Sequence, residues 1–167
     1  WPAGVELEAL GRDDLVGAGH FADCINDSFA RLAGHAPLAG NDLRTWFDDE
    51  GYLEGGILLL KHDGRPIGTL MVMRDSEDPG TAEIAALGVV AARQGGGLGR
   101  RLLRYGVDWA ARRGFHSIVL SVNAENESAL RLYLAEGFIR IETMVCYACR
   151  LDREFVPGSA GDSARPG

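Results

Sequence analysis

The chain has 167 residues, of which 46% are hydrophobic and 25% charged, the balance of one soluble globular domain. Its formal net charge of −7 argues against a nucleic-acid partner, because nucleic-acid-binding proteins usually present a basic face. No apolar run approaches the roughly 20 residues that cross a bilayer, and three cysteines are an odd count that indicates a reducing compartment. We therefore expect a cytoplasmic protein without a membrane partner, with a single domain at residues 1–155 and a disordered tail at residues 156–167.

The first half of the chain predicts a strand, two helices and a hairpin. Apolar residues at helical spacing from Leu15 to Leu32 indicate the first helix. The pair Asp63-Gly64 is a strong hairpin signal, because both residues tolerate a positive φ. The predicted elements are strands at Val5–Ala9, Ile57–Lys61 and Ile67–Met73 and helices at Asp13–Leu32 and Asn41–Glu50.

The second half predicts strands and helices in alternation. Gly114 and Gly137 supply helix stops, and Asn126 is a typical helix N-cap. The predicted elements are strands at Thr81–Ala91 and Ser117–Val122, helices at Leu98–Arg113 and Asn126–Glu136, and one or two closing strands within Phe138–Leu151. Cys146 and Cys149 fall in the last segment, where strand geometry places them on opposite faces, so we interpret both as packing residues.

Between the longest predicted strand and the next helix, four of five positions are glycine, at 95, 96, 97 and 99. Glycine lets a backbone turn tightly and approach a phosphate without a Cβ in the way, and a helix N-terminus offers free N–H groups. Arg100 and Arg101 add positive charge. No Gly-Lys-Ser/Thr follows, so this is not a Walker loop, and the spacing also fails the dinucleotide fingerprint. The glycines alone predict either a phosphate site or a flexible loop with a helix cap.

Two motifs in order extend this interpretation. The segment Gln94-Gly95-Gly96-Gly97-Leu98-Gly99 fits [QR]-x-x-G-x-[GA], and Asn126, Ala129, Tyr133, Gly137 and Phe138 fit N-x-x-A-x-x-x-Y-x-x-x-G-F. With both motifs the chain resembles the GNAT superfamily of N-acetyltransferases. The resemblance implies an α/β (α+β) fold, with a mixed central sheet that is splayed between its fourth and fifth strands and flanked by helices.

The resemblance also implies a binding site for acetyl-CoA as co-substrate. The four histidines share no ligand spacing with carboxylates or thiols, so we expect no metal. Backbone amides from Gln94 through Leu98 and Gly99 to Arg100 would hold the pyrophosphate. The pantetheine arm would run along Glu83–Val89, with the Leu87 N–H polarising the thioester carbonyl and Val89 bonding the arm. Gly88 would mark the bulge that opens the sheet. Asn126 would bond the pantetheine or the loop, although helix capping explains it equally.

The implied reaction is direct attack of a primary amine on the thioester in a ternary complex. Glu83 is the candidate general base, the alternative being a solvent-facing strand residue. Tyr133 is the candidate acid for the leaving thiolate, the alternative being a core tyrosine. The acceptor is a small-molecule or protein amine, and a homodimer is possible in this family. Two other functions stay open: a non-catalytic acyl-CoA sensor, and transfer of a longer acyl group.

Overall fold

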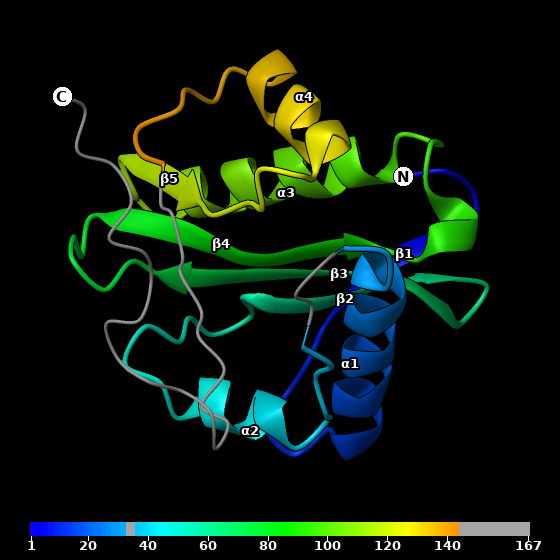
Figure 1. Ribbon diagram of the computed structural model, residues 1–167. Coiled ribbons are helices and arrows are strands. Elements are labelled where there is room, and N and C mark those ends of the chain that lie inside the picture. Colours follow the sequence, from blue (N-terminus) through cyan, green and yellow to red (C-terminus); the bar gives the residue numbers. More distant parts are fainter. Residues whose placement is uncertain (33–35, 144–167) are drawn as a thin grey trace, which may run out of the picture.

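The computed structural model describes residues 1–32 and 36–143. A five-stranded sheet in the order β1-β2-β3-β4-β5 lies between two helical layers, with α1 and α2 on one face and α3 and α4 on the other (Figure 1). The first four strands pair antiparallel, and β5 joins β4 in parallel. The elements are β1 Val5–Ala9, α1 Leu15–Phe29, α2 Asp42–Phe47, β2 Ile57–His62, β3 Arg65–Arg74, β4 Thr81–Val89, η1 Ala91–Arg93, α3 Leu98–Arg112, β5 Ser117–Leu120 and α4 Glu127–Ala135.

The mixed sheet flanked by helices confirms the predicted fold class. Asp63 and Gly64 have φ values of 50° and 74°, as the hairpin prediction requires. Three details differ. Leu15 is 58% exposed rather than buried, because the inward stripe of α1 begins only at Gly17 and Ala18. The short helix η1 was not predicted, and no strand forms within residues 138–143. Cys146, Cys149 and the rest of the predicted closing strands lie outside the described residues.

The central strands are continuous apolar runs because helices cover both of their faces. In β2, Leu58 and Leu60 face the cluster beneath α3, whereas Ile57 and Leu59 face the cluster beneath α1 and α2. All four side chains are at most 3% exposed. Phe21 is fully buried at the centre of the second cluster. Because helices cover both faces of the central strands, the backbone polar groups that a ligand can reach lie at the edges of the sheet.

A bulge in β4 changes which of its residues bond to β3. Met71 pairs with Ala86 and Val72 with Ile84, which leaves Ala85 as the extra residue. Ahead of the bulge, the Thr81 carbonyl accepts a hydrogen bond from the N–H of Asp75, the residue after β3. Beyond the bulge, the Val90 N–H donates to the Ile67 carbonyl. Bonding residues alternate along an antiparallel ladder, so odd-numbered residues bond β3 before the bulge and even-numbered ones after it.

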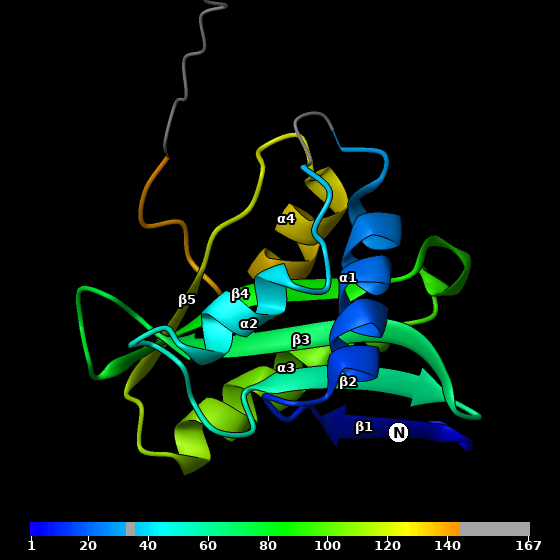
Figure 2. The ribbon, with the colours of Figure 1, turned by 90° about the horizontal axis from the view of Figure 1, so that it is seen from below.

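The bulge therefore turns the backbone groups of Leu87 and Val89 away from β3, toward the side of β5. There the sheet is open, because β5 pairs only with residues 81–84 of β4. After Leu120 the chain leaves the line of β4 (Figure 2). The predicted splay between the fourth and fifth strands is thus present, but Gly88 was wrongly predicted to be the bulge.

Gly88 instead lets α1 approach the sheet. A Cβ at this position would lie 2.8 Å from the Ser28 hydroxyl oxygen and 3.1 Å from the Ser28 Cβ. That side chain also donates a hydrogen bond to the Cys24 carbonyl, so it cannot swing away without loss. The absence of a side chain at 88 sets the spacing between α1 and the open part of β4.

We expect Gly88→Ala to lower the free energy of unfolding by about 1–3 kcal/mol, because the new methyl group overpacks the contact between α1 and β4. Gly106→Ala is the matched control, since its Cβ would meet only ordinary contacts from 3.4 Å upward. Urea denaturation of both variants measures the difference. Equal stability of the two variants would contradict the close approach at Gly88.

Candidate active site

The loop between η1 and α3 presents a run of backbone amides without partners. Gly95 and Gly97 adopt φ values of 80° and 79°, which side chains rarely tolerate. Gly97 is the N-cap of α3 and provides no side-chain cap, and the first helical bond runs from the Arg101 N–H to the Gly97 carbonyl. Within residues 1–32 and 36–143, none of the amides from 95 to 100 has a hydrogen-bond partner. These amides and the helix dipole form an anion site.

The loop is held from behind, which leaves its front free. The Gln94 side-chain amide donates to the Val89 carbonyl at 2.9 Å, and the Asp27 carboxylate accepts from the Ala91 N–H at 2.6 Å. A Cβ on Gly96 would have only the Arg93 carbonyl nearby, at 3.8 Å, and the φ of Gly96 is not positive. Neither the conformation of the protein nor its packing explains this glycine, whereas close approach of a ligand does.

The open edge of β4 runs directly into this loop. Val89 is the last residue of β4, and its carbonyl is already occupied by Gln94. The groups that remain available are the N–H and C=O of Leu87 and the N–H of Val89, which face the same side by the alternation described above. The described structure thus brings Leu87, Val89 and the predicted loop residues together in one continuous polar surface.

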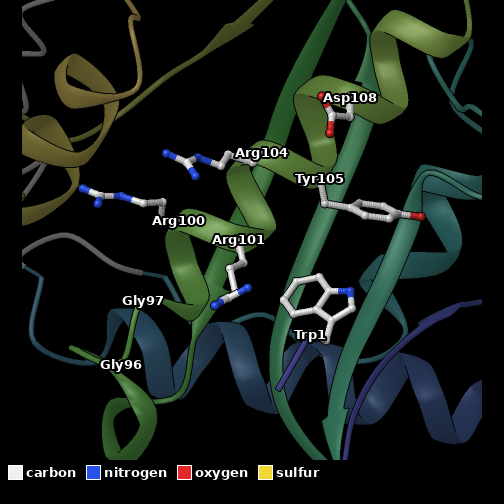
Figure 3. A pocket seen from close by; sticks show the side chains of 8 residues that line it. All are labelled: Trp1, Gly96, Gly97, Arg100, Arg101, Arg104, Tyr105 and Asp108. Carbon is white, nitrogen blue, oxygen red and sulfur yellow. The ribbon is translucent and has the colours of Figure 1, made fainter. Parts of the chain in front are cut away.

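A cavity of about 460 Å³ lies along α3, and Gly96 and Gly97 form part of its lining (Figure 3). Arg101 points to the same side of α3 as Trp1, whereas Arg100 and Arg104 extend away from it. Trp1 packs against Tyr105 with ring centroids 6.5 Å apart. The lining residues are Trp1, Gly96, Gly97, Arg100, Arg101, Arg104, Tyr105 and Asp108. The cavity therefore combines an aromatic wall with the cation of Arg101, which has no ion-pair partner in the described part of the chain.

Tyr133 lies on α4, on the same face of the sheet as α3. The helix starts where the Asn126 side chain accepts from the Ala129 N–H at 3.2 Å, and it ends at Ala135, two residues before Gly137, whose φ is 90°. Phe138 then folds back, its ring 5.9 Å from that of Tyr133. Burial raises the pKa of Tyr133, so its phenol stays protonated at neutral pH. Asn126 is seen as a cap, one of its two predicted roles.

Glu83 lies on the opposite face of the sheet, before the bulge. It pairs with Met73, whose side chain belongs to the cluster beneath α1 and α2. Burial, and secondarily the charge of Asp75, raise the pKa of this half-buried carboxyl above its ordinary value. Glu83 and Tyr133 thus lie on the two opposite faces of the sheet, on either side of β4.

An ion-pair cluster beside the loop was not foreseen from the sequence. Glu136, at the end of α4, accepts from Arg104 Nε at 2.6 Å and pairs with Arg100 Nε at 3.0 Å. The two arginines lie four residues apart on α3, which indicates a shared face, but the sequence has no signal that places the end of α4 opposite them. No cluster of three or more candidate metal ligands occurs among the described residues, and none of the described helices is long and apolar enough to cross a membrane.

The raised pKa of Glu83 predicts a pH-dependent stability. Between its ordinary value of 4.5 and the raised value, the folded chain binds more protons than the unfolded chain, so the free energy of unfolding falls as pH rises. The free energy of unfolding of Glu83→Gln, minus that of the wild type, should therefore increase as the pH rises from below 4.5 to 8. Urea denaturation across this range tests it, with the exposed Glu125→Gln as control. A difference that does not vary with pH would contradict the burial of the Glu83 charge.

Known proteins resemble this chain in sequence. A family model described as the acetyltransferase (GNAT) family matches residues 23–138. The chain is 35% identical over 115 residues to a mycothiol acetyltransferase of Paenarthrobacter aurescens, which covers 67% of this chain and 34% of that protein. It is 33% identical over 157 residues to a mycothiol acetyltransferase of Kocuria rhizophila, covering 87% and 50%. The chain thus spans between a third and a half of the length of these curated relatives.

Solved structures show the same fold at low sequence identity. An aminoglycoside acetyltransferase from an uncultured soil metagenomic sample, in complex with trehalose, superposes with a TM-score of 0.68 at 16% identity, covering 90% of this chain and 99% of that one. A putative acetyltransferase from Salmonella typhimurium with its cofactor acetyl-CoA gives 0.64 at 20% identity, covering 81% and 80%. Together with the matched family model, the glycine loop and the Tyr133 helix identify this chain as a member of the GNAT family of acetyltransferases.

Proposed function

We propose that this domain binds acetyl-CoA and transfers its acetyl group to a primary amine by direct attack in a ternary complex. The observation that carries the proposal is the run of partnerless amides from 95 to 100, continuous with the open edge of β4. Six free N–H groups at a helix N-terminus suit a pyrophosphate. A sheet edge with free N–H and C=O groups suits the amide-bearing pantetheine arm, which can bond to it as an added strand does.

Each part of the thioester has a counterpart in this chain. The amides of the glycine loop hold the pyrophosphate, and the charges of Arg100 and Arg101 add to their attraction. The Val89 N–H and the Leu87 C=O face the pantetheine arm. The Leu87 N–H is left to polarise the thioester carbonyl, where negative charge develops as the amine attacks. The cavity with the unpaired Arg101 and the Trp1–Tyr105 wall receives the phosphorylated nucleoside end.

The transfer forms one C–N bond, breaks one C–S bond and moves one proton from amine to thiolate. An alkylamine of ordinary pKa is only about 0.1% neutral near pH 7.4, so a base is needed. Glu83 takes this role from the face of the sheet that α1 and α2 cover. A raised carboxyl pKa suits a general base, because it lies closer to the pH at which the enzyme works. Tyr133, which burial keeps protonated, donates to the departing sulfur. Cys24 is buried in α1 with its pKa raised to about 11, which argues against an acyl-cysteine intermediate at that residue.

The acceptor belongs to the class of amines. The relatives are named for mycothiol, and the structural neighbours for aminoglycosides or for an alanine of ribosomal protein S18, so these names include both small-molecule and protein substrates. A panel with the acceptor of the mycothiol enzymes, the aminoglycoside sisomicin and a peptide with a free N-terminus separates small-molecule from protein substrates. Release of CoA thiol with one member identifies its class. Tight binding of acetyl-CoA with no thiol release from any amine would indicate an acyl-CoA sensor instead.

A charge placed at Gly96 tests the pyrophosphate site. Gly96→Glu should weaken CoA binding at least 100-fold, because it sets a carboxylate among the amides without straining the backbone. Gly96→Gln has nearly the same bulk and no charge, and should weaken binding much less. Calorimetric titration with CoA compares the two variants. Equal loss in both, or none in either, would contradict an anion site at the loop.

Removing the Tyr133 hydroxyl tests the acid. Tyr133→Phe should lower kcat by 10²–10⁴-fold, the usual effect of general acid catalysis, while the affinity for acetyl-CoA changes little. Thiol release with the fastest amine of the panel gives kcat, and calorimetry gives the affinity. A variant with unchanged kcat would leave Tyr133 as a packing residue against Phe138.

A further inference from the structure

Glu136 is a carboxylate placed where two electrostatic effects disfavour it. It lies at the C-terminal end of α4, where the helix dipole repels a negative charge. It also lies beside the glycine loop, since it pairs with Arg100, whose own N–H is one of the free amides. A carboxylate near an anion site weakens binding of the anion and neutralises part of the positive charge that Arg100 and Arg104 supply. Its presence therefore needs a different explanation.

Glu136 on α4 is bound by Arg100 and Arg104 on α3, and we call these three residues the clamp. Its side chain is only 10% exposed, while those of Arg100 and Arg104 are 50% and 65% exposed. Arg104 donates to both carboxylate oxygens, from Nε to Oε2 at 2.6 Å and from Nη2 to Oε1 at 3.2 Å, and Arg100 Nε lies 3.0 Å from Oε1. The hydrogen bond from Arg104 is the main cause that lowers the pKa of Glu136, so the carboxylate stays ionised. A two-pronged pair of this kind fixes direction as well as distance.

Among residues 1–32 and 36–143, the helix that this clamp holds has few other attachments. None of the residues of α4 is buried, and its inward side chains, Leu132 and Tyr133, only border the cluster beneath α3. Glu136 follows Tyr133 by three residues, which is about one helical turn. The clamp thus joins the start of α3, where the free amides lie, to the turn of α4 that carries the phenol (Figure 1).

We propose that Glu136 is a positioning residue, which holds α4 against the start of α3 so that Tyr133 faces the sulfur of the bound thioester. The inference rests on the proposed function and adds a residue that acts through Tyr133 rather than on the substrate. It implies a trade: the carboxylate gives up some affinity for CoA in exchange for a correctly placed acid. Binding and turnover should therefore change in opposite directions when the charge is removed.

Glu136→Gln is the direct test, with acetyl-CoA as the probe for binding and the fastest amine of the panel for turnover. We expect CoA to bind about threefold more tightly, because a like charge has gone, and kcat to fall about tenfold. Hydrogen exchange should speed up in α4 and stay unchanged in α3, a readout that needs no acceptor. Glu127→Gln is the matched control on the same helix, since its carboxylate pairs with Arg131 at the exposed surface; it should change none of these quantities.

Two further variants separate positioning from general loss of stability. Arg104→Gln removes the same clamp but leaves the carboxylate, so kcat should fall without a gain in CoA affinity. In a Tyr133→Phe background, Glu136→Gln should cost no further kcat, because the residue acts through the phenol.

The inference is overturned if Glu136→Gln behaves as Glu127→Gln does, if it weakens CoA binding, or if its effect on kcat persists in the Tyr133→Phe background. If the variants give any of those results while the wild-type chain binds CoA, the proposed function is unaffected. A wild-type chain that does not bind CoA would overturn both.

Discussion

One extra residue in β4, Ala85, decides which backbone groups of β4 bond β3 and which face the open edge of the sheet. Before the bulge, odd-numbered residues bond β3; beyond it, even-numbered residues do, so Leu87 and Val89 turn their polar groups outward. Because the pairing of β5 with β4 ends at Ile84, those groups have no strand partner among the described residues. The same change of phase turns the side chain of Leu87 toward the α3 face, while Glu83 faces α1 and α2. Without the bulge, the even-numbered residues of β4 would face the open edge instead, and the side chain of Leu87 would lie on the same face as that of Glu83.

The anion site depends on the absence of side chains in the glycine loop more than on added positive charge. Two glycines with positive φ, Gly95 and Gly97, shape the loop. A third, Gly96, keeps the loop open to a ligand, although neither its backbone conformation nor its packing requires a glycine. The chain as a whole is acidic, with a formal charge of −7, so attraction of an anion must come from local dipoles and from arginines near α3. Glu136 cancels part of that arginine charge. The geometry thus favours ordered attachment of α4 over the highest possible affinity for the cofactor.

The sequence predicted much of the fold, because its signals are local. Helical spacing found α1 and α3, glycines marked helix ends at 114 and 137, and the Asp63-Gly64 turn adopts the positive φ values expected. The bulge was placed at Gly88 because glycine often marks one, whereas the register puts it at an alanine. Register depends on pairing between distant strands, which no local pattern encodes. The clamp of Arg100, Arg104 and Glu136 was missed for the same reason: its members are on different helices.

The central claim is that the free amides at 95–100 and at the edge of β4 form one binding surface for the thioester. Residue-resolved NMR of the backbone amides during titration with CoA tests it most directly. We predict that the amides of residues 95–100, Leu87 and Val89 shift together and become protected from exchange, while those of β2 do not move. Shifts confined to the glycine loop, with Leu87 and Val89 unchanged, would contradict the account, because the loop would then be a phosphate site without a pantetheine track.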